Sequence, residues 1–306
     1  MRVVKLFLIL LVLAFAMVPE MKLKRVHGNV YMVRGIDALP SLENRGFMSN
    51  AFGVLTREGW VVIDALSTPE LSKEFVDNLM RVKRAPIRYA IITHYHPDHW
   101  YGALTYEKMG AKIIAHKKLL DFYQSGEAHA ALKANNERFK GLYSGVVLVA
   151  PHIVVEDRTR LKVGDTIFEI ISMAPAHTDN DLVVYMPTEK ILFTGDLVYK
   201  DRIPFMGDRG ASSKGLIKAL ERIKAMDAKM LLGGHNEPMD MSAVDYTLGY
   251  VSFLRERVKR LKEEGKSLDE IKEALRHSPY EKAVMYENFH NANIFRVDFE
   301  LDMEEQ

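Results

Sequence analysis

The segment Thr93-His94-Tyr95-His96-Pro97-Asp98-His99 decides how this chain folds around its chemistry. It places three imidazoles and one carboxylate within six residues, at the spacing His-x-His-x-Asp-His. The preceding residues, 88–92, are apolar enough to predict a short buried strand, and Pro97 predicts the first position of a helix, where its missing N–H costs nothing. The ligand-type side chains therefore lie on a strand-to-helix turn, where side chains converge in α/β structures.

This cluster predicts a metal site. Neutral imidazole and carboxylate groups suit zinc, iron or manganese. Three protonated histidines so close together would repel one another, so the cluster is costly without a metal. Because one ion rarely takes four ligands from so short a segment, two neighbouring ions are expected. We prefer this interpretation to a set of unrelated packed histidines.

Three further ligand-type residues follow in order, each after an apolar stretch that predicts a strand. They are His177 in Pro175-Ala176-His177-Thr178, Asp196 in Phe193-Thr194-Gly195-Asp196 and His235 in Gly233-Gly234-His235. The small residues beside them permit tight turns and a close approach of the backbone to a metal or a substrate. Each is weak evidence alone, but the ordered set is strong.

In this order the motifs resemble those of the metallo-β-lactamase superfamily of metallo-hydrolases, over roughly residues 26–240. Residues 45–51 and 202–208 also resemble the secreted zinc metallohydrolases associated with quinoprotein and sulfur-oxidation systems. The alternation of strands and helices itself predicts two packed sheets with helices outside. The resemblance makes this a four-layer αββα sandwich, an α+β fold, with a C-terminal helical appendage.

The resemblance also implies a role for each ligand-type residue. One metal would be held by His94, His96 and His177, the second by Asp98, His99 and His235, and Asp196 would bridge both. Two zinc ions are expected, with iron or manganese as alternatives. A water between such ions loses its proton easily, because a zinc-bound water has a pKa of about 7.

The implied reaction is hydrolysis of an ester, thioester or lactam by a metal-bound hydroxide, with Asp98 as the catalytic residue that orients it and carries the proton. The best-known β-lactamases have a cysteine or no bridging ligand where this chain has Asp196, so only modest activity on β-lactams is expected. Two alternatives stay open: a non-haem iron dioxygenase of the persulfide type on the same fold, and a metal-binding accessory protein without turnover. The complete seven-residue set argues against the dioxygenase, whose iron needs only two histidines and one carboxylate.

Composition limits the partners. The chain has 306 residues, 27% charged and 48% hydrophobic, which suffices for one large domain and an appendage. The net charge of +1 favours no nucleic-acid partner, so a small-molecule substrate is expected. The absence of cysteine excludes disulfides, thiolate ligands and cysteine nucleophiles. The oligomeric state is not indicated.

Residues 1–16 predict a secretory signal peptide. Arg2 and Lys5 precede an apolar run of thirteen residues, 6–18, which contains the A-x-A-type site Ala14-Phe15-Ala16. The run is shorter than the roughly 20 residues of a membrane span, so an uncleaved anchor is the less favoured alternative. We therefore expect a periplasmic or secreted protein without stable membrane association after cleavage.

The rest of the chain is predicted as a catalytic domain over residues 17–240 and a helical region over residues 241–306. The polar segment 117–143 is interpreted as a solvated helix rather than as a cover over the site. Residues 197–210 predict a loop beside the metals, either a pocket wall with Arg202 or Lys200 as an anion anchor or an ordinary surface loop. The remaining histidines are expected at the surface or behind the ligands: His27, His116, His129, His152, His277 and His290.

Overall fold

The computed structural model describes residues 20–304, so the expected signal peptide lies outside the described residues. Within them, two sheets are formed. The first has the order β1 (Leu23–His27), β2 (Val30–Val33), β3 (Ala51–Thr56), β4 (Gly59–Ile63), β5 (Ile87–Ile91), β6 (Lys112–His116) and β7 (Ile153–Val155). The second has the order β12 (Met230–Gly233), β11 (Ile191–Gly195), β10 (Leu182–Met186), β9 (Thr166–Ser172) and β8 (Arg158–Val163).

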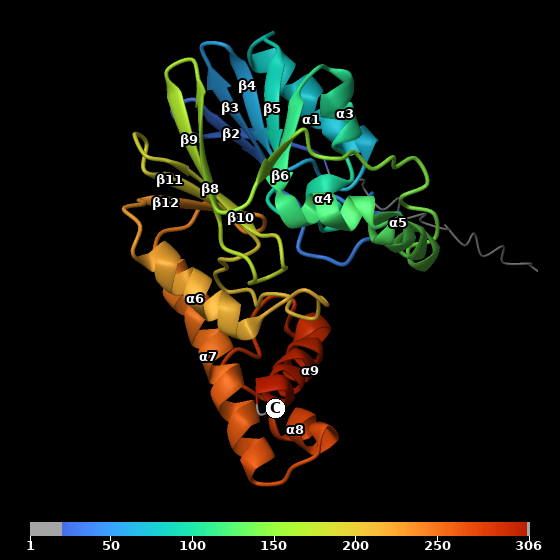
Figure 1. Cartoon of the computed structure of the whole chain (residues 1–306), viewed down its shortest axis with the longest axis vertical. Coiled ribbons are helices and arrows are strands. Elements are labelled where there is room, and N and C mark those ends of the chain that lie inside the picture. The colour runs from blue at the N-terminus through green and yellow to red at the C-terminus, as the bar shows by residue number, and fades with distance from the viewer. Residues whose placement is uncertain (1–19, 305–306) are drawn as a thin grey trace, which may run out of the picture.

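The two sheets pack face to face through an apolar core to which both contribute. Phe52 of β3 meets Phe193 of β11 edge-on, with ring centroids 5.1 Å apart. Helices cover the outer faces: α1 (Pro69–Val82) and α3 (Leu104–Lys108) pack on the first sheet, and α6 (Ser213–Lys224) on the second (Figure 1). The four-layer αββα sandwich expected from the resemblance is therefore confirmed.

Parallel pairing brings the carboxyl ends of several strands to one edge. β4, β5 and β6 are parallel neighbours in the first sheet, and β11 pairs with β12 in parallel in the second. β4 and β11 are buried along their whole length, as expected for strands covered on both faces. The loops that follow β4, β5, β11 and β12 consequently emerge close together.

Local sequence fixes where the neighbouring helices begin. The Thr68 side chain caps α1 by accepting the Leu71 N–H. Helix α2 (Pro97–Trp100) starts at Pro97, as the sequence predicted, so His96 sits at the turn itself. Segment 117–143 forms α4 (Lys117–Gln124) and α5 (Glu127–Arg138), separated by Gly126 in the left-handed region at φ 82°.

The C-terminal residues form three helices, α7 (Ser242–Glu263), α8 (Leu268–Ala274) and α9 (Tyr286–Glu304). They share one apolar core with α6 and the outer face of the second sheet (Figure 1). Ser267 and Glu270 cap α8 reciprocally. Salt bridges tie α7 to α9, such as Arg255 to Glu300 at 3.2 Å. Among residues 20–304, no helix has the length and apolarity that crossing a bilayer requires.

Candidate metal centre

The loops at the shared sheet edge bring all seven predicted ligand residues together. The turn from β5 to α2 carries four of them, the β9–β10 loop carries His177, and Asp196 and His235 follow β11 and β12. Their side chains form three clusters in which the ligand atoms lie within 4.8 Å of one another: His94, His96 and His177; His94, His99 and Asp196; and Asp98, His99 and His235. No residue of the predicted set lies away from the centre.

The first cluster is a triangle of ring nitrogens. Nδ1 of His96 lies 3.1 Å from Nε2 of His94 and 2.9 Å from Nε2 of His177. Zn–N bonds of about 2.0–2.1 Å would place neighbouring tetrahedral ligand atoms roughly 3.3 Å apart. The two separations from His96 are therefore close to those that a zinc-like ion requires.

Asp98, His99 and His235, called the second cluster below, lie beside the first, and the carboxylates of Asp98 and Asp196 complete the centre. Nε2 of His99 lies 3.6 Å from Oδ2 of Asp98, and Nε2 of His235 lies 3.7 Å from the same oxygen. Asp196 reaches both clusters, because its Oδ1 is 3.3 Å from His99 Nε2 and its Oδ2 is 3.7 Å from His177 Nε2. This geometry suits a bridging carboxylate.

Close packing beside Asp196 explains one of the glycines that the sequence placed there. A Cβ atom at Gly234 would lie 2.1 Å from Oδ1 of Asp196 and 2.6 Å from the ring of His99. Only a residue without a side chain fits at this position. The expectation that small residues permit a close approach is confirmed at Gly234.

Each of the five histidines is fixed by a partner on its far nitrogen. These partners are Thr93 Oγ1 for His94 (3.0 Å), Asp208 Oδ2 for His96 (3.1 Å), Asp64 Oδ2 for His99 (2.8 Å), the Phe205 carbonyl for His177 (2.8 Å) and the Met48 carbonyl for His235 (3.0 Å). An acceptor on one ring nitrogen holds the hydrogen there and leaves the other lone pair free. Five ring nitrogens consequently face the centre.

The electrostatics of the cluster favour the cation-binding forms of His94, His177 and Asp196, but they favour the protonated form of His99. Burial, together with the neighbouring imidazoles, lowers the pKa of His94 and takes that of His177 to about 4. Burial would also lower the pKa of His99, but the carboxylates of Asp196 and Asp64 outweigh it and raise this pKa to about 10. The pKa of Asp196 stays well below its usual range despite burial, because His235 and His99 face it. A cation at this centre would supply the charge that the His99 proton otherwise supplies.

Two buried atoms at the centre have no hydrogen-bond partner among the described residues. They are Nε2 of His99 and Oδ1 of Asp196, which face each other without a hydrogen bond of acceptable geometry. Buried polar atoms nearly always have a hydrogen-bond partner, so these two unpaired atoms need an explanation. A metal ion coordinated by both atoms would satisfy them, and the residues present fit such an ion.

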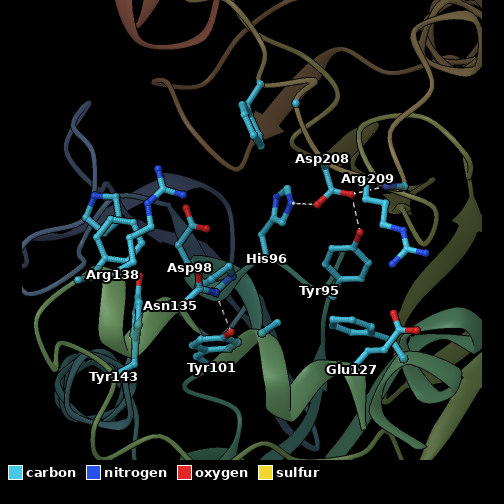
Figure 2. A pocket seen from close by; sticks show the side chains of 18 of the residues that line it. Tyr95, His96, Asp98, Tyr101, Glu127, Asn135, Arg138, Tyr143, Asp208 and Arg209 are labelled. Atoms are coloured by element: carbon cyan, nitrogen blue, oxygen red, sulfur yellow. Dashed lines mark hydrogen bonds and ion pairs between the residues drawn. The ribbon is translucent and has the colours of Figure 1, made fainter. Parts of the chain in front are cut away.

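A cleft of about 1010 Å³ opens beside the centre, with His96 and Asp98 in its wall. Six aromatic rings line it, those of Tyr95, Tyr101, Phe122, Phe139, Tyr143 and Phe205. Figure 2 shows Arg138 and Arg209 on either side of His96 and Asp98. Neither guanidinium forms an ion pair with any residue between 20 and 304, so both are available to a bound molecule.

The interpretation of segment 117–143 as a solvated helix rather than a cover over the site is only half right, because α5 is largely exposed but the segment also borders the cleft. Its helices form one wall of the cleft, to which they contribute Phe122, Ala130, Ala131, Asn135 and Arg138. Ala128 is the only fully buried residue of α5. Helix α5 is polar because most of its residues are exposed, and this composition resembles that of an ordinary surface helix.

The loop at residues 197–210 is part of the pocket wall, through Phe205 and the residues 207–210. Arg202, however, is not available as an anion anchor. It is 4% exposed and forms a 2.7 Å ion pair with Asp37. Lys200 is exposed and does not line the cleft. The cationic groups of the cleft are Arg138 and Arg209, which the sequence did not single out.

The expectation for the other six histidines is confirmed for four of them, which are exposed: His27, His129, His152 and His277. It is wrong for His116 and His290. His116 is buried and caps α4 by accepting the Lys118 N–H. His290 is buried within the C-terminal helices, where its ring nitrogens bond the Tyr250 hydroxyl and the Leu275 carbonyl.

Comparison with known proteins agrees with this geometry. Residues 44–235 match the sequence model of the Metallo-beta-lactamase superfamily, and the chain belongs to this superfamily. A type 2 metallo-beta-lactamase of Elizabethkingia meningoseptica is 22% identical over 244 residues, covering 79% of this chain and 89% of the relative. A linear primary-alkylsulfatase of a Pseudomonas species is 17% identical over 260 residues, covering 73% of this chain and 49% of the sulfatase.

Among solved structures, the stereoselective inverting sec-alkylsulfatase Pisa1 from Pseudomonas sp. superposes with a TM-score of 0.74 at 21% identity. The superposition covers 92% of this chain and 50% of the sulfatase. This chain thus spans about half the length of either sulfatase. The likeness shows a shared fold, and the named relatives are all hydrolases.

Proposed function

We propose that this protein is a dinuclear metal-dependent hydrolase of an ester, thioester or lactam. The observation that carries the proposal is the convergence of five imidazole lone pairs and two carboxylates beside the cleft. The metallo-beta-lactamase and alkylsulfatase relatives support a hydrolase. Because two relatives are named alkylsulfatases, sulfate esters belong among the esters to be tested.

The metals proposed are two zinc ions, with iron or manganese compatible with the same ligands. His94, His96 and His177 would hold the first, Asp98, His99 and His235 the second, and Asp196 would bridge them. When bound, such ions supply Lewis acidity and lower the pKa of a coordinated water to about 7.

Asp98 is the proposed catalytic residue. Its carboxylate lines the cleft, and it lies in the first turn of α2, where Pro97 fixes the direction of the chain. The backbone carbonyl of Asp98 also accepts a hydrogen bond from the buried Ser49 hydroxyl, which holds the turn in place. In this position Asp98 can orient the attacking water, accept its proton and pass it to the leaving group.

The rest of the cleft is proposed to bind the substrate. Its aromatic lining fits an apolar body, and rings of this kind bury a large area with little loss of side-chain freedom. Arg138 and Arg209 would bind an anionic group, because a guanidinium pairs well with carboxylate or sulfate oxygens. We therefore propose a substrate that combines an apolar part with a negative charge.

Export is also proposed, with cleavage after Ala16 and a small-molecule substrate met outside the cytoplasm. The support is the charge, apolar run and cleavage-type site within residues 1–18. N-terminal sequencing of protein from the native host should give a chain that begins at Met17. An intact Met1 on membrane-bound material would contradict cleavage and favour the anchor.

Hydrolysis is tested with apo protein reconstituted with zinc or with iron. Chromogenic carboxylate esters, a thioester, a chromogenic cephalosporin and 4-nitrophenyl sulfate form the panel, and oxygen uptake is followed in parallel. The zinc form should cleave at least one ester or thioester, and His96→Ala should not. Turnover by the iron form alone, with oxygen consumption, would contradict the hydrolase and favour a dioxygenase.

A further inference from the structure

The C-terminal helix α9 lies against the segment Ile203–Gly210, hereafter the 203–210 segment, which forms one wall of the cleft. The contact is tight: a Cβ atom at Gly207 would lie 3.2 Å from Cβ of Ala292. The ring of Phe205 also meets the ring of Phe289 on α9, with centroids 5.2 Å apart. Helix α9 therefore supports this wall from behind.

A buried side chain of α9, Asn293, makes one of the polar connections between this helix and the segment. Asn293 is fully buried, and its Oδ1 accepts the Met206 N–H at 2.7 Å. Its Nδ2 donates to the Pro204 carbonyl at 2.8 Å and to the Tyr250 hydroxyl at 3.0 Å. The amide thus bonds the backbone on both sides of Phe205.

Phe205 itself connects this wall to the metal centre. Its carbonyl, between the two groups that Asn293 holds, accepts the Nδ1–H of His177 at 2.8 Å. That hydrogen bond sets the tautomer and the ring direction of His177. A shift of this carbonyl would rotate the imidazole away from the point where the lone pairs of His94 and His96 meet.

A second connection runs from α9 to His96. Arg296 donates a hydrogen bond to the backbone carbonyl of Asp208. The Asp208 carboxylate in turn accepts from Nε2 of His96 at 3.1 Å and from the Tyr95 hydroxyl at 2.5 Å. Two of the three histidines of the first cluster are consequently held by hydrogen bonds to the 203–210 segment.

The second cluster has different supports. His99 bonds Asp64, and His235 bonds the Met48 carbonyl, both in the N-terminal half of the chain. Neither partner contacts α9 through a hydrogen bond within the described residues. A disturbance at Asn293 should therefore reach one cluster and spare the other.

We propose that Asn293 is a positioning residue for the first metal, acting through Phe205 on His177, with Arg296 acting in parallel through Asp208 on His96. The proposal rests on the dinuclear site proposed above. Asparagine suits the role because one amide accepts from an N–H and donates to a carbonyl at the same time. Leucine, of similar volume, can do neither.

The test measures zinc binding by Asn293→Leu in the full chain. Competition against a chromogenic chelator gives the number of ions and the dissociation constant of each, and anomalous diffraction identifies the depleted site. Partners behind metal-bound histidines typically change metal affinity 10–100-fold, so we expect a loss of about tenfold or more at the His94–His96–His177 site. The dissociation constant of the other site should change by less than about twofold.

Glu300→Ala is the matched control. Glu300 lies two turns further along α9 and accepts from the N–H and hydroxyl of Ser213 on α6, away from the cleft. It should lower the thermal stability of the apo protein without changing either zinc affinity. If Asn293→Leu does not fold, Arg296→Met removes the second connection and should weaken the same site.

The outcomes separate the two proposals. Fewer than two zinc ions in the wild type would contradict the dinuclear hydrolase itself. Two ions in the wild type with unchanged affinities in the folded variant would overturn the role of Asn293 alone. Equal weakening of both sites, or the same loss in Glu300→Ala, would show general destabilisation and would also overturn it.

Discussion

Asp64 is expected to control the affinity for both metals, although it is not one of the seven proposed ligands. It follows β4, is 1% exposed and has a left-handed backbone, with φ 64°. Its Oδ2 accepts from Nδ1 of His99 at 2.8 Å and from the Thr93 hydroxyl at 3.0 Å, and its Oδ1 accepts from the Thr93 N–H at 2.8 Å. Thr93 in turn bonds His94. One carboxylate therefore orients a histidine of each cluster.

The informative change is Asp64→Asn. Asparagine tolerates the left-handed backbone and has nearly the same volume, so the main chain should stay in place. Three donors converge on the carboxylate, and an amide can accept through only one of its two terminal atoms. With the amide nitrogen at either position, an N–H points at a donor from Thr93 or His99, and at least one buried donor loses its acceptor.

The expected size follows from this count. Each lost hydrogen bond to a buried donor costs about 1–3 kcal/mol of folding stability. When a histidine loses the partner that fixes its tautomer, the affinity for the metal that it binds should fall about 10–100-fold, which corresponds to roughly 1.4–2.7 kcal/mol. Because His99 is bonded directly and His94 through Thr93, the zinc affinity should fall at both sites, and more at the site of His99.

The assay is the chelator competition described for Asn293, together with thermal unfolding of the apo and zinc forms. Asp77→Asn is the control, because Asp77 pairs with Lys73 on the exposed face of α1. It should change neither zinc affinity nor stability measurably. Wild-type zinc affinity at both sites in a folded Asp64→Asn protein would show that Asp64 does not orient these histidines for metal binding.

Three further results are expected. Asp196→Ala should lose both metals and all hydrolysis, measured by elemental analysis and ester cleavage, because this carboxylate alone reaches both clusters; one retained, active metal would contradict bridging. Arg138→Ala should raise KM about tenfold for an ester with an anionic group but not for a neutral ester, and equal effects on both would exclude an anion contact. Hydrogen bonds from Ser267 lower the pKa of Glu270 to about 2. The wild-type protein should therefore be more stable than Glu270→Gln above about pH 4.5, and this difference should vanish as the pH falls towards 2. A difference in Tm that does not depend on pH would contradict this.

The convergence of the seven proposed ligand residues could be predicted from the sequence because each belongs to a short motif that follows an apolar strand. Parallel pairing of β5 with its neighbours, and of β11 with β12, then brings the strand ends to one edge. Asp64 carried the same signal, since it follows the buried strand β4, and it could have been proposed on that ground. Asp208 carried none, because its role depends on how a loop folds back onto His96.

The cleft was harder to predict, because its walls come from segments that meet only when the chain is folded. Periodicity reports which side chains face an apolar core, whereas α5 is largely exposed and borders the cleft with only part of its surface. Arg202 stands near Asp196 in sequence, yet its charge is taken up by Asp37 from a distant segment. Likewise, nothing in the sequence around Asn293 indicates that this side chain forms hydrogen bonds to the 203–210 segment. Such contacts appear only when the chain is folded.

Hydrolysis by two metals held in this centre can be tested by titrating apo protein with zinc and measuring the rate of ester cleavage at each addition. Cleavage should appear with the metal, rise until two equivalents of zinc are bound per chain, and consume no oxygen. A protein that saturates with one iron, takes up oxygen and leaves the ester intact at every zinc concentration would contradict it.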